Sequence, residues 1–399
     1  MPVFKISGGA YQNIDESSLG LQSPALIDGY VDELNNTVKR PALKIWKDGT
    51  GSITTPIRGL FYWAAADKVI ILANGTAFTL ASDGTLTNAT TSAIGTDNPA
   101  IFAAGKWSTT HRLFIASGGE IGYLADASDI PNNKMVKSSV SFTNLTPTAV
   151  THVATINGWV ICNSGAAAFK QTFYYSDDNL DPLVWTAGNL ATAEMRPDEI
   201  VALHAFWNEL YLFGSTICEI WHDDGVTPFS RIPGAIIHTG CSAPYTVIQA
   251  GGTVYWLDDR RRFVRLKGRV AQPVSNPFQK VFEGFTNIYD AIAYKMSWGG
   301  RNWIVLSFPS SGVDQSFIYD YDLDQWAEWG AWDTTDNVYT RFKGNCSTEI
   351  TAAVTTATAT ANGETGSNDT DIGTRAWSNP TNIQGNPDDA DVASVTNID

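Results

Sequence analysis

The sequence predicts an all-β protein whose central part is a β-propeller of about six blades. Of its 399 residues, 12% are aromatic and only 17% are charged, which is typical of an ordered globular chain. Apolar residues alternate or run continuously over short stretches, as in strands that pack on one or both faces, and helical periodicity is almost absent. The most specific observation is an internal repeat of about 47 residues.

Each copy of the repeat contains three or four short strands separated by tight polar turns. Clear copies are LFYWAAADKVIILANGTAFTLASDG from Leu60 and VALHAFWNELYLFGSTICEIWHDDG from Val201. The intervals overlap the period of roughly 40 to 50 residues of propeller blades, which bury their faces only by stacking on neighbours. An array of β-sandwiches, which also has short strands at regular spacing, is the alternative. The middle strands of six copies begin at Val69, Leu113, Trp159, Leu210, Val254 and Trp303, at intervals of 44, 46, 51, 44 and 49 residues.

Three parts of the chain differ in composition. A propeller with unpaired ends would expose its first and last blades, so we expect ring closure to use strands from both chain ends. The segment before Ile57 should therefore lie against the sixth repeat. We expect an extended N-terminal arm and closing strand at residues 1–56, a β-propeller at 57–345, and a polar C-terminal segment rich in Thr, Ala and Asp at 346–399.

Charge and cysteine usage exclude several classes of protein. The net charge of -15 repels both nucleic-acid phosphates and anionic lipid, which disfavours a conventional DNA-binding or membrane-surface role. The start MPVFKISGGAYQ lacks the basic and apolar regions of a secretory signal, so we expect the chain to be made and kept in the cytoplasm before assembly. Four distant cysteines without CxxC spacing predict free thiols and neither a disulfide framework nor a zinc site.

No group of residues forms a catalytic signature, and we predict no enzymatic activity, metal or cofactor. The five histidines are scattered, without spacing that would place two on one metal. Acidic residues recur where third strands end, which favours turns and strand caps over the paired carboxylates of a glycosidase. These acidic residues are Asp177, Asp178, Asp223, Asp224, Asp258, Asp259, Asp320, Asp322 and Asp324.

A dense basic segment stands out in this acidic chain. In its strand RFVRLKG, alternation predicts that Val264 and Leu266 point inward, whereas Phe263, Arg265 and Lys267 point outward. The segment is either an interface for an acidic partner surface or an ordinary solvated edge strand that its charges protect from aggregation. The interface candidates are Arg260, Arg261, Arg262, Arg265, Lys267 and Arg269.

Two stretches resemble a known family. They are SGGAYQNIDESSLGLQSPALIDGYVDELNNTVKRPAL, from Ser7 to Leu43, and GAIIHTGCSAPYTVIQAGGTVYWLDDRRRFVRLKG, from Gly234 to Gly268. Both resemble the tail nozzle, or packaged-DNA stabilisation, proteins of short-tailed bacteriophages, and the resemblance extends loosely over residues 1–345. The Thr- and Asp-rich stretch after residue 347 does not match the family.

This resemblance implies a virion protein of the phage tail, assembled in the host cytoplasm. It implies a ring of six subunits that closes the DNA-filled head and conducts DNA at ejection. The implied partners are further copies of the chain, an adaptor or portal-proximal tail protein, distal tail or fibre proteins, and double-stranded DNA as a transiting cargo, without membrane insertion. A carbohydrate-binding or carbohydrate-cleaving propeller is the alternative, because exposed Trp and Asp also suit sugar sites.

A channel for DNA would also give the acidic charge a function. Carboxylates along the wall would repel the phosphate backbone and let DNA slide. Asp223, Asp224 and Asp258, which follow predicted strands, are the candidates for lining the channel. The alternative is that the charge is spread over the outer surface and only keeps a large assembly soluble.

Overall fold

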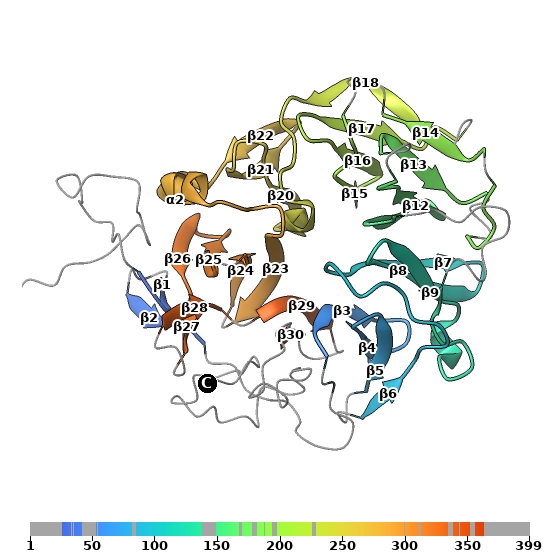
Figure 1. Ribbon diagram of the computed structural model, residues 1–399, viewed down its shortest axis with the longest axis horizontal. Helices are drawn as coiled ribbons and strands as arrows, with labels where there is room; N and C mark the ends of the chain where they lie inside the picture. Colours follow the sequence, from blue (N-terminus) through green and yellow to red (C-terminus); the bar gives the residue numbers. More distant parts are fainter. Residues whose placement is uncertain are drawn as a thin grey trace, which may run out of the picture. The chain divides into compact units, whose positions relative to one another are not determined.

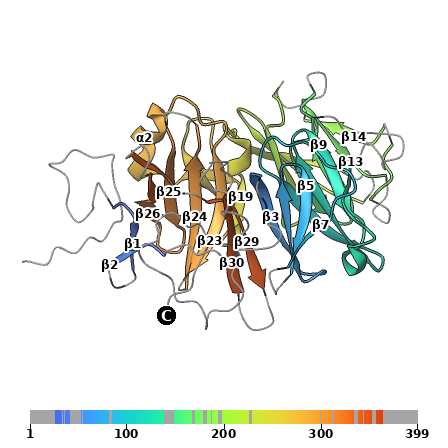
Figure 2. The ribbon, with the colours of Figure 1, turned by 60° about the horizontal axis from the view of Figure 1, so that its bottom comes forward.

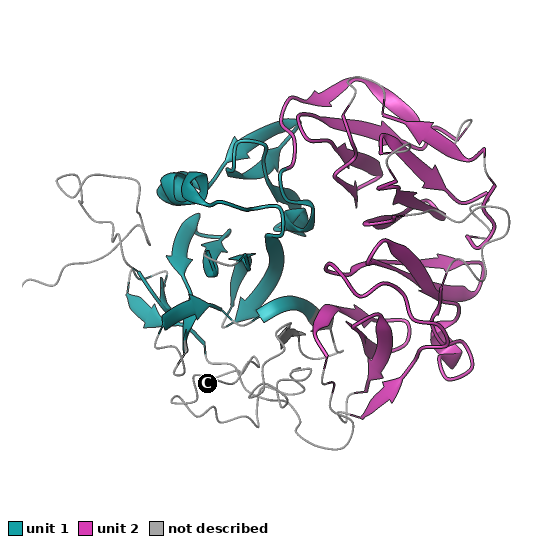
Figure 3. Ribbon diagram, in the orientation of Figure 1, with its two compact units in different colours: residues 1–48, 242–399 teal, residues 49–241 magenta. Residues whose placement is uncertain are grey.

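A computed structural model describes most of residues 26–362. The chain divides into two compact units, which are coloured separately in Figure 3: unit 1 contains residues 1–48 and 242–399, and unit 2 contains residues 49–241. Side chains are described up to residue 348. The positions within 26–362 that the structure leaves out are 33, 35, 42–52, 54, 82–84, 138–148, 167–169, 178–181, 187, 194–197, 226–228, 299, 311–312, 334–337, 343 and 352–355.

Unit 2 contains four antiparallel sheets of four strands, each a meander built from consecutive strands (Figure 1). The first contains β3 (Ile57–Trp63), β4 (Lys68–Ala73), β5 (Thr76–Leu80) and β6 (Leu86–Asn88), and the second β7 (Ile101–Trp107), β8 (Thr110–Ser117), β9 (Glu120–Leu124) and β10 (Val136–Lys137). The third contains β11 (Val153–Ile156), β12 (Trp159–Asn163), β13 (Thr172–Tyr175) and β14 (Leu190–Thr192), and the fourth β15 (Ala202–Phe206), β16 (Glu209–Phe213), β17 (Cys218–His222) and β18 (Ser230–Ile237).

Unit 1 contains two further sheets of the same kind. The fifth contains β19 (Ile248–Ala250), β20 (Thr253–Leu257), β21 (Phe263–Lys267) and β22 (Val270–Pro273), and the sixth β23 (Ile292–Trp298), β24 (Arg301–Phe308), β25 (Gln315–Asp320) and β26 (Gln325–Glu328). A short helix, α2 (Gln279–Gly284), joins them. Three hairpins complete the unit: β1 (Gly29–Val31) with β2 (Thr37–Lys39), β27 (Gly330–Asp333) with β28 (Val338–Arg341), and β29 (Gly344–Thr351) with β30 (Thr356–Asn362).

The prediction of an all-β fold is confirmed, and each predicted repeat forms one four-stranded sheet. The expected middle strands correspond to β4, β8, β12, β16, β20 and β24. The predicted boundary at residue 345 lies inside β29, so the beginning of the polar C-terminal segment is paired with β30. Residues 363–399 lie outside the described part of the chain.

The middle strands are apolar because both of their faces are buried. In β8, Leu113 and Ile115 belong to a hydrophobic cluster shared with the first sheet, whereas Phe114 and Ala116 belong to one shared with the third. The two faces of one strand therefore pack on two different neighbouring sheets. This packing explains why β8 reads as a continuous apolar run and not as an alternating strand.

The N-terminal segment packs against the sixth sheet, next to β26 (Figure 2). Ile27 forms a parallel bridge with Glu328, and the Asp28 amide donates to the Glu328 carbonyl at 2.8 Å. The indole N–H of Trp329 donates to the Gly29 carbonyl at 2.9 Å. The expected contact between the segment before Ile57 and the sixth repeat is thus present at these residues.

Among the described strands, the two chain ends do not share one sheet. The first sheet ends with its own β6 and the sixth with its own β26, so local sequence supplies all four strands of each. Apart from the Ile27 bridge, β1 pairs with β2 and lies against the sixth sheet as a separate hairpin. Consecutive hairpins can form each sheet without a distant strand, because short turns connect antiparallel neighbours.

A carboxylate fixes the turn that connects β16 to β17. Asp198 accepts hydrogen bonds from the amides of Ser215 at 2.9 Å and Thr216 at 2.7 Å, and from the Thr216 hydroxyl at 3.0 Å. Partial burial alone would raise the pKa of Asp198, but the hydrogen bonds from Ser215 and Thr216 outweigh burial and lower it. The ionised carboxylate therefore stabilises the folded turn.

We predict that Asp198→Asn lowers the free energy of unfolding by about 1–2 kcal/mol at neutral pH, because hydrogen bonds to a charged acceptor are lost. The folded-state pKa is lower than the unfolded one, so the contribution is full above about pH 4 and disappears as pH falls through the folded-state value. Urea unfolding at about pH 7, 5 and 3 should show the gap from wild type narrowing with acid. The exposed control Asp97→Asn should match wild type throughout, and a gap that is independent of pH would contradict the assignment.

We also predict a graded loss of stability at Trp329, which is fully buried between Trp303 and Phe342. Trp329→Phe should cost about 1 kcal/mol, mainly through the lost hydrogen bond to Gly29, and Trp329→Ala about 3–5 kcal/mol. Urea unfolding followed by circular dichroism measures both. Trp332→Ala, at a half-exposed position, is the control, and equal losses at the two tryptophans would contradict the packing.

Candidate functional site

The basic segment occupies the loop before β21, the strand itself and the turn after it. Asp258 anchors the loop, since its carboxylate accepts from the amides of Arg260 at 2.9 Å and Arg262 at 2.7 Å. The same carboxylate forms an ion pair with the Arg262 guanidinium at 2.6 Å. Burial raises the pKa of Asp258, and the hydrogen bonds and charge of Arg262 oppose that effect.

This geometry corrects the prediction that Asp258 lines a channel. The Asp258 side chain is fully buried, and its oxygens are taken up by the loop that it supports. A carboxylate in this position cannot face a passing phosphate backbone. Its role is the turn role that the sequence pattern of acidic residues favoured.

Two of the six basic interface candidates also serve the fold. Arg262 pairs with Asp258, and Arg261 donates to the carbonyls of Glu283 at 3.0 Å and of Phe285. The Arg261 guanidinium therefore binds carbonyls at the C-terminal end of α2, where a positive charge is favourable. Substituting Arg261 would disturb this local structure as well as any contact that the basic segment makes with a partner.

The other basic residues lie closer to solvent. Arg260, Lys267 and Arg269 are exposed, and Arg265 is half-buried, with its side chain donating to Gln272 at 3.0 Å. Val270, directly after Arg269, is 66% exposed. The turn from Lys267 to Val270 therefore combines two cations with an apolar side chain.

The prediction that Phe263 points outward is wrong. Phe263 is fully buried and stacks on Tyr255, with ring centroids 5.8 Å apart, and it also contacts Trp326. Val264 and Leu266 are buried as expected. The alternation rule failed because it assumed one solvated face, whereas β21 is covered on both faces at its beginning.

The remaining channel candidates follow β17. Asp223 accepts from the Asn157 amide group at 3.3 Å and from the Gly225 amide at 3.0 Å, and Asp224 is exposed. The Asn157 contact joins the β11–β12 turn to the end of the fourth sheet. Asp223 and Asp224 thus lie at a surface end of unit 2, which is compatible with either a channel wall or a partner contact.

The turn between β15 and β16 carries an exposed tryptophan, Trp207, that was not among the sequence candidates. Trp207 is 84% exposed in the two-residue turn between β15 and β16, and its φ angle is 56°. A large aromatic side chain is uncommon at positive φ. The tripeptide Trp207-Asn208-Glu209 in a predicted hairpin turn could have signalled it, because Asn and Gly are the residues that such turns favour.

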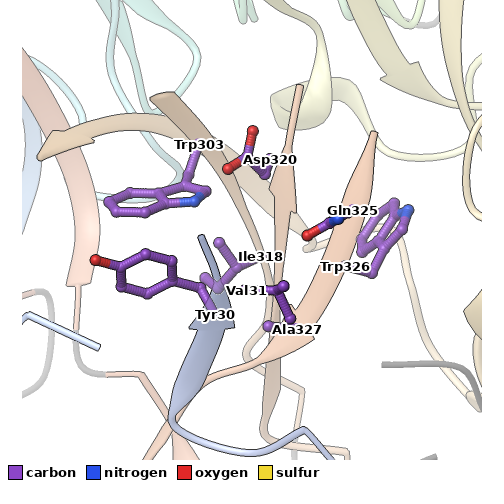
Figure 4. A pocket seen from close by; sticks show the side chains of 8 residues that line it. All are labelled: Tyr30, Val31, Trp303, Ile318, Asp320, Gln325, Trp326 and Ala327. Carbon is purple, nitrogen blue, oxygen red and sulfur yellow. The ribbon is translucent and has the colours of Figure 1, made fainter. Parts of the chain in front are cut away.

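The pocket in Figure 4 lies where the N-terminal segment packs on the sixth sheet. Tyr30 and Val31 of β1 form one wall, and Trp303 and Asp320 form another (Figure 4). Arg301 pairs with Asp320 at 3.3 Å and donates to the Val31 carbonyl at 3.4 Å. The polar groups around the pocket therefore hold the chain's own strand in place.

The other candidate chemical groups have structural partners. Asp320 accepts from the amides of Asp322 at 3.1 Å and Leu323 at 3.0 Å, as a turn residue does. None of the four cysteines forms a disulfide, and burial raises the pKa of the Cys162 thiol, which keeps it protonated. Among the residues that the structure describes, no group of three or more His, Cys, Asp or Glu could hold a metal ion, and no helix is long and apolar enough to cross a membrane.

Comparisons with known proteins bear on the identity of this chain. No curated protein matches the sequence. Among solved structures, PorZ, a surface component of the type-IX secretion system of Porphyromonas gingivalis, aligns with 9% identity and a TM-score of 0.43. The alignment covers 86% of this chain and 40% of that one, so this chain spans less than half of the length of PorZ.

A chain from the S. cerevisiae complex of Dbp5 with Nup159 and Gle1 aligns with 10% identity and a TM-score of 0.41, over 82% of this chain and 91% of that one. Both likenesses are too weak to carry an argument.

A family match is informative. The model of a phage stabilisation family, described as bacteriophage P22 Gp10, beta-propeller, matches residues 38–345. The matched range contains all six four-stranded sheets and confirms the prediction of a propeller. It also supports a structural protein of a bacteriophage, as the resemblance at Ser7–Leu43 and Gly234–Gly268 implied. Because the match covers well over half of its length, the chain belongs to this phage stabilisation family of β-propeller proteins.

Proposed function

We propose that this protein is a tail subunit of a short-tailed phage that closes the DNA-filled head and forms the channel for DNA ejection. The single observation that carries the proposal is the family match over residues 38–345, because that family is named for phage stabilisation and described by bacteriophage P22 Gp10. The subunit acts without catalysis, by occupying its place in the virion. Its proposed location is the tail, after assembly in the host cytoplasm.

The proposed assembly is a closed ring of identical subunits, with six as the expected number. Two different surfaces of each subunit must then meet its neighbours, as in any head-to-tail ring. The exposed cations Lys267 and Arg269 support such a contact, because two cations at the β21–β22 turn of an acidic protein can pair with acidic residues of another copy, and Arg260 lies at the other end of β21. An adaptor or portal-proximal tail protein would bind one end of the ring, and distal tail or fibre proteins the other.

The net charge supports a passage in which DNA is not held. Each phosphate that a protein neutralises adds affinity that depends on salt, and strong affinity would slow ejection. With a net charge of -15, the chain disfavours such binding. Asp223 and Asp224 remain the candidates for the wall of the channel.

The carbohydrate-directed alternative is not favoured. The family match points to a phage structural protein. A glycosidase would need two opposed carboxylates with a defined separation. Among the described acidic residues that recur with the repeat, Asp177, Asp258 and Asp320 instead hydrogen-bond within their own loops.

We predict that particles of the encoding phage made without this protein contain heads that lose their DNA. Their DNA should be digested by added nuclease, and incubation with purified wild-type protein before DNA is lost should restore protection. Electron microscopy of the repaired particles should show added density at the tail end of the head. The matched control is the same incubation with heat-unfolded protein.

Two outcomes would contradict the proposed function. Particles that lack the protein and retain DNA as wild-type particles do would remove the closing role. Particles that retain DNA but no longer bind cells or glycans would favour the carbohydrate-directed alternative.

A further inference from the structure

The side chain of Trp207 is unusual among the aromatic residues of this protein. Trp185, Trp256, Trp303 and Trp329 are fully buried, whereas Trp207 is 84% exposed. It stands in the turn between β15 and β16, where Phe206 and Glu209 are the paired residues that close the hairpin. Only Phe206, whose ring meets the indole edge to face at 6.0 Å, is recorded as an aromatic contact of Trp207 in the described chain.

The fold does not require a tryptophan at this turn. In the equivalent turn of the third sheet, Asn157 and Gly158 occupy the positive φ angles, and these residue types tolerate that backbone well. Trp207 adopts φ 56° despite its bulk, so the position is strained and its side chain gains little from burial. An exposed indole of this kind is typical of an anchor in a protein interface, where Trp is enriched among the residues that dominate binding.

The surroundings of Trp207 are acidic. Glu209 begins β16, and its register partner His222 is followed by Asp223 and Asp224. Neither Lys nor Arg occurs among residues 207–209 or 222–225, and the cation in the neighbouring strand is Arg231 of β18, the register partner of Trp221. The indole therefore projects from an end of the fourth sheet that carries three carboxylates.

The turn between β21 and β22 has the complementary character. Lys267 and Arg269 are exposed, and Val270 beside them is 66% exposed. Residues 260–273 include no Asp or Glu. This turn offers an apolar side chain for an indole to cover and cations for the carboxylates around it.

We propose that Trp207 of one copy docks on the β21–β22 turn of a second copy of this chain. The indole covers Val270 and stacks on the Arg269 guanidinium, since an aromatic face attracts a cation. Asp224 pairs with Lys267 and Arg269 at the edge of the contact. Because the two surfaces differ, each subunit can bind two others head to tail, and such contacts form a ring where the rotation between subunits closes.

This inference rests on the proposed function for its biological setting, and it assigns Asp224 to a subunit contact in place of the channel wall. The two assignments predict different results for Asp224→Arg. A contact residue would weaken assembly. A channel residue would leave assembly unchanged and slow DNA release.

The first test measures assembly of the full chain by sedimentation velocity over a range of concentrations. Trp207→Ala should weaken self-association at least tenfold, because removing a central aromatic anchor typically has an effect of this size. Trp332→Ala is the matched control, since it deletes another exposed tryptophan, and it should associate like wild type. Circular dichroism melting should show that Trp207→Ala is folded.

The second test uses charge. Lys267→Glu with Arg269→Glu should reduce association, whereas the control pair Lys39→Glu with Lys280→Glu, at other exposed lysines, should not. Adding Asp224→Arg to the Arg269→Glu chain should restore part of the lost association. If exchanging the two charges restores association, the side chains at positions 224 and 269 meet across the contact. Two residues with separate structural roles would not restore it.

The third test mixes two defective chains. Trp207→Ala chains retain an intact β21–β22 turn, and Lys267→Glu/Arg269→Glu chains retain an intact Trp207. Each alone should stay monomeric, and an equal mixture should form one-to-one dimers that do not grow into rings. Dimers in the mixture support one contact made from two different surfaces.

Several results would overturn the inference. Normal assembly of Trp207→Ala, a failed charge exchange, or a mixture that stays monomeric would each reject the contact. A wild-type chain that stays monomeric up to about 100-fold above the lowest concentration of the sedimentation test would reject self-docking as well. None of these results removes the proposed function, which the DNA-retention experiment tests separately.

Discussion

The fold depends on the packing of four-stranded sheets against one another, which in unit 2 covers both faces of the second and third sheets. A single meander of this size cannot bury the two apolar faces of its middle strand. In unit 2, Leu113 of β8 packs in a cluster with the first sheet and Phe114 in a cluster with the third. Likewise, Val160 of β12 packs with the second sheet and Ile161 with the fourth. Buried strand residues therefore provide most of the stability, and the turns can carry exposed side chains that bind partners.

The strands could be predicted from sequence because their burial leaves a clear pattern. An apolar run of four to six residues every 44 to 51 residues identifies a middle strand, and the predicted start at Trp159 coincides with the start of β12. The same burial caused the error at Phe263. Simple alternation assumes that one face is wet, and nothing local to RFVRLKG indicates that aromatic rings from β20 and β26 cover the other face.

The candidate surfaces were harder to predict, because a charged side chain is defined by its partner. Arg261 looks like its basic neighbours in sequence, yet it binds the carbonyls of Glu283 and Phe285, which α2 places beside it. Asp258 follows a strand, as Asp224 does, but its sequence position does not reveal that it accepts from the amides of its own loop. Trp207 was missed because aromatic residues in this chain are mostly core, and the Asn208 beside it, which favours a turn, was not weighed as a sign of exposure.

The placement of the N-terminal segment has a consequence for how the chain is made. Unit 2 is continuous and can fold once residue 241 has been synthesised, whereas unit 1 joins residues 1–48 to residues 242–399. Leu26 and Val31 have no sixth sheet to cover until Glu328 exists, and closing a loop of this length costs about 5 kcal/mol in chain entropy. Leu26 and Val31 therefore remain uncovered through most of translation, exposed to chaperones and proteases. Docking of the N-terminal segment marks a chain that has been translated through the sixth repeat, so prematurely terminated subunits would carry an uncovered arm that distinguishes them from finished ones before assembly begins.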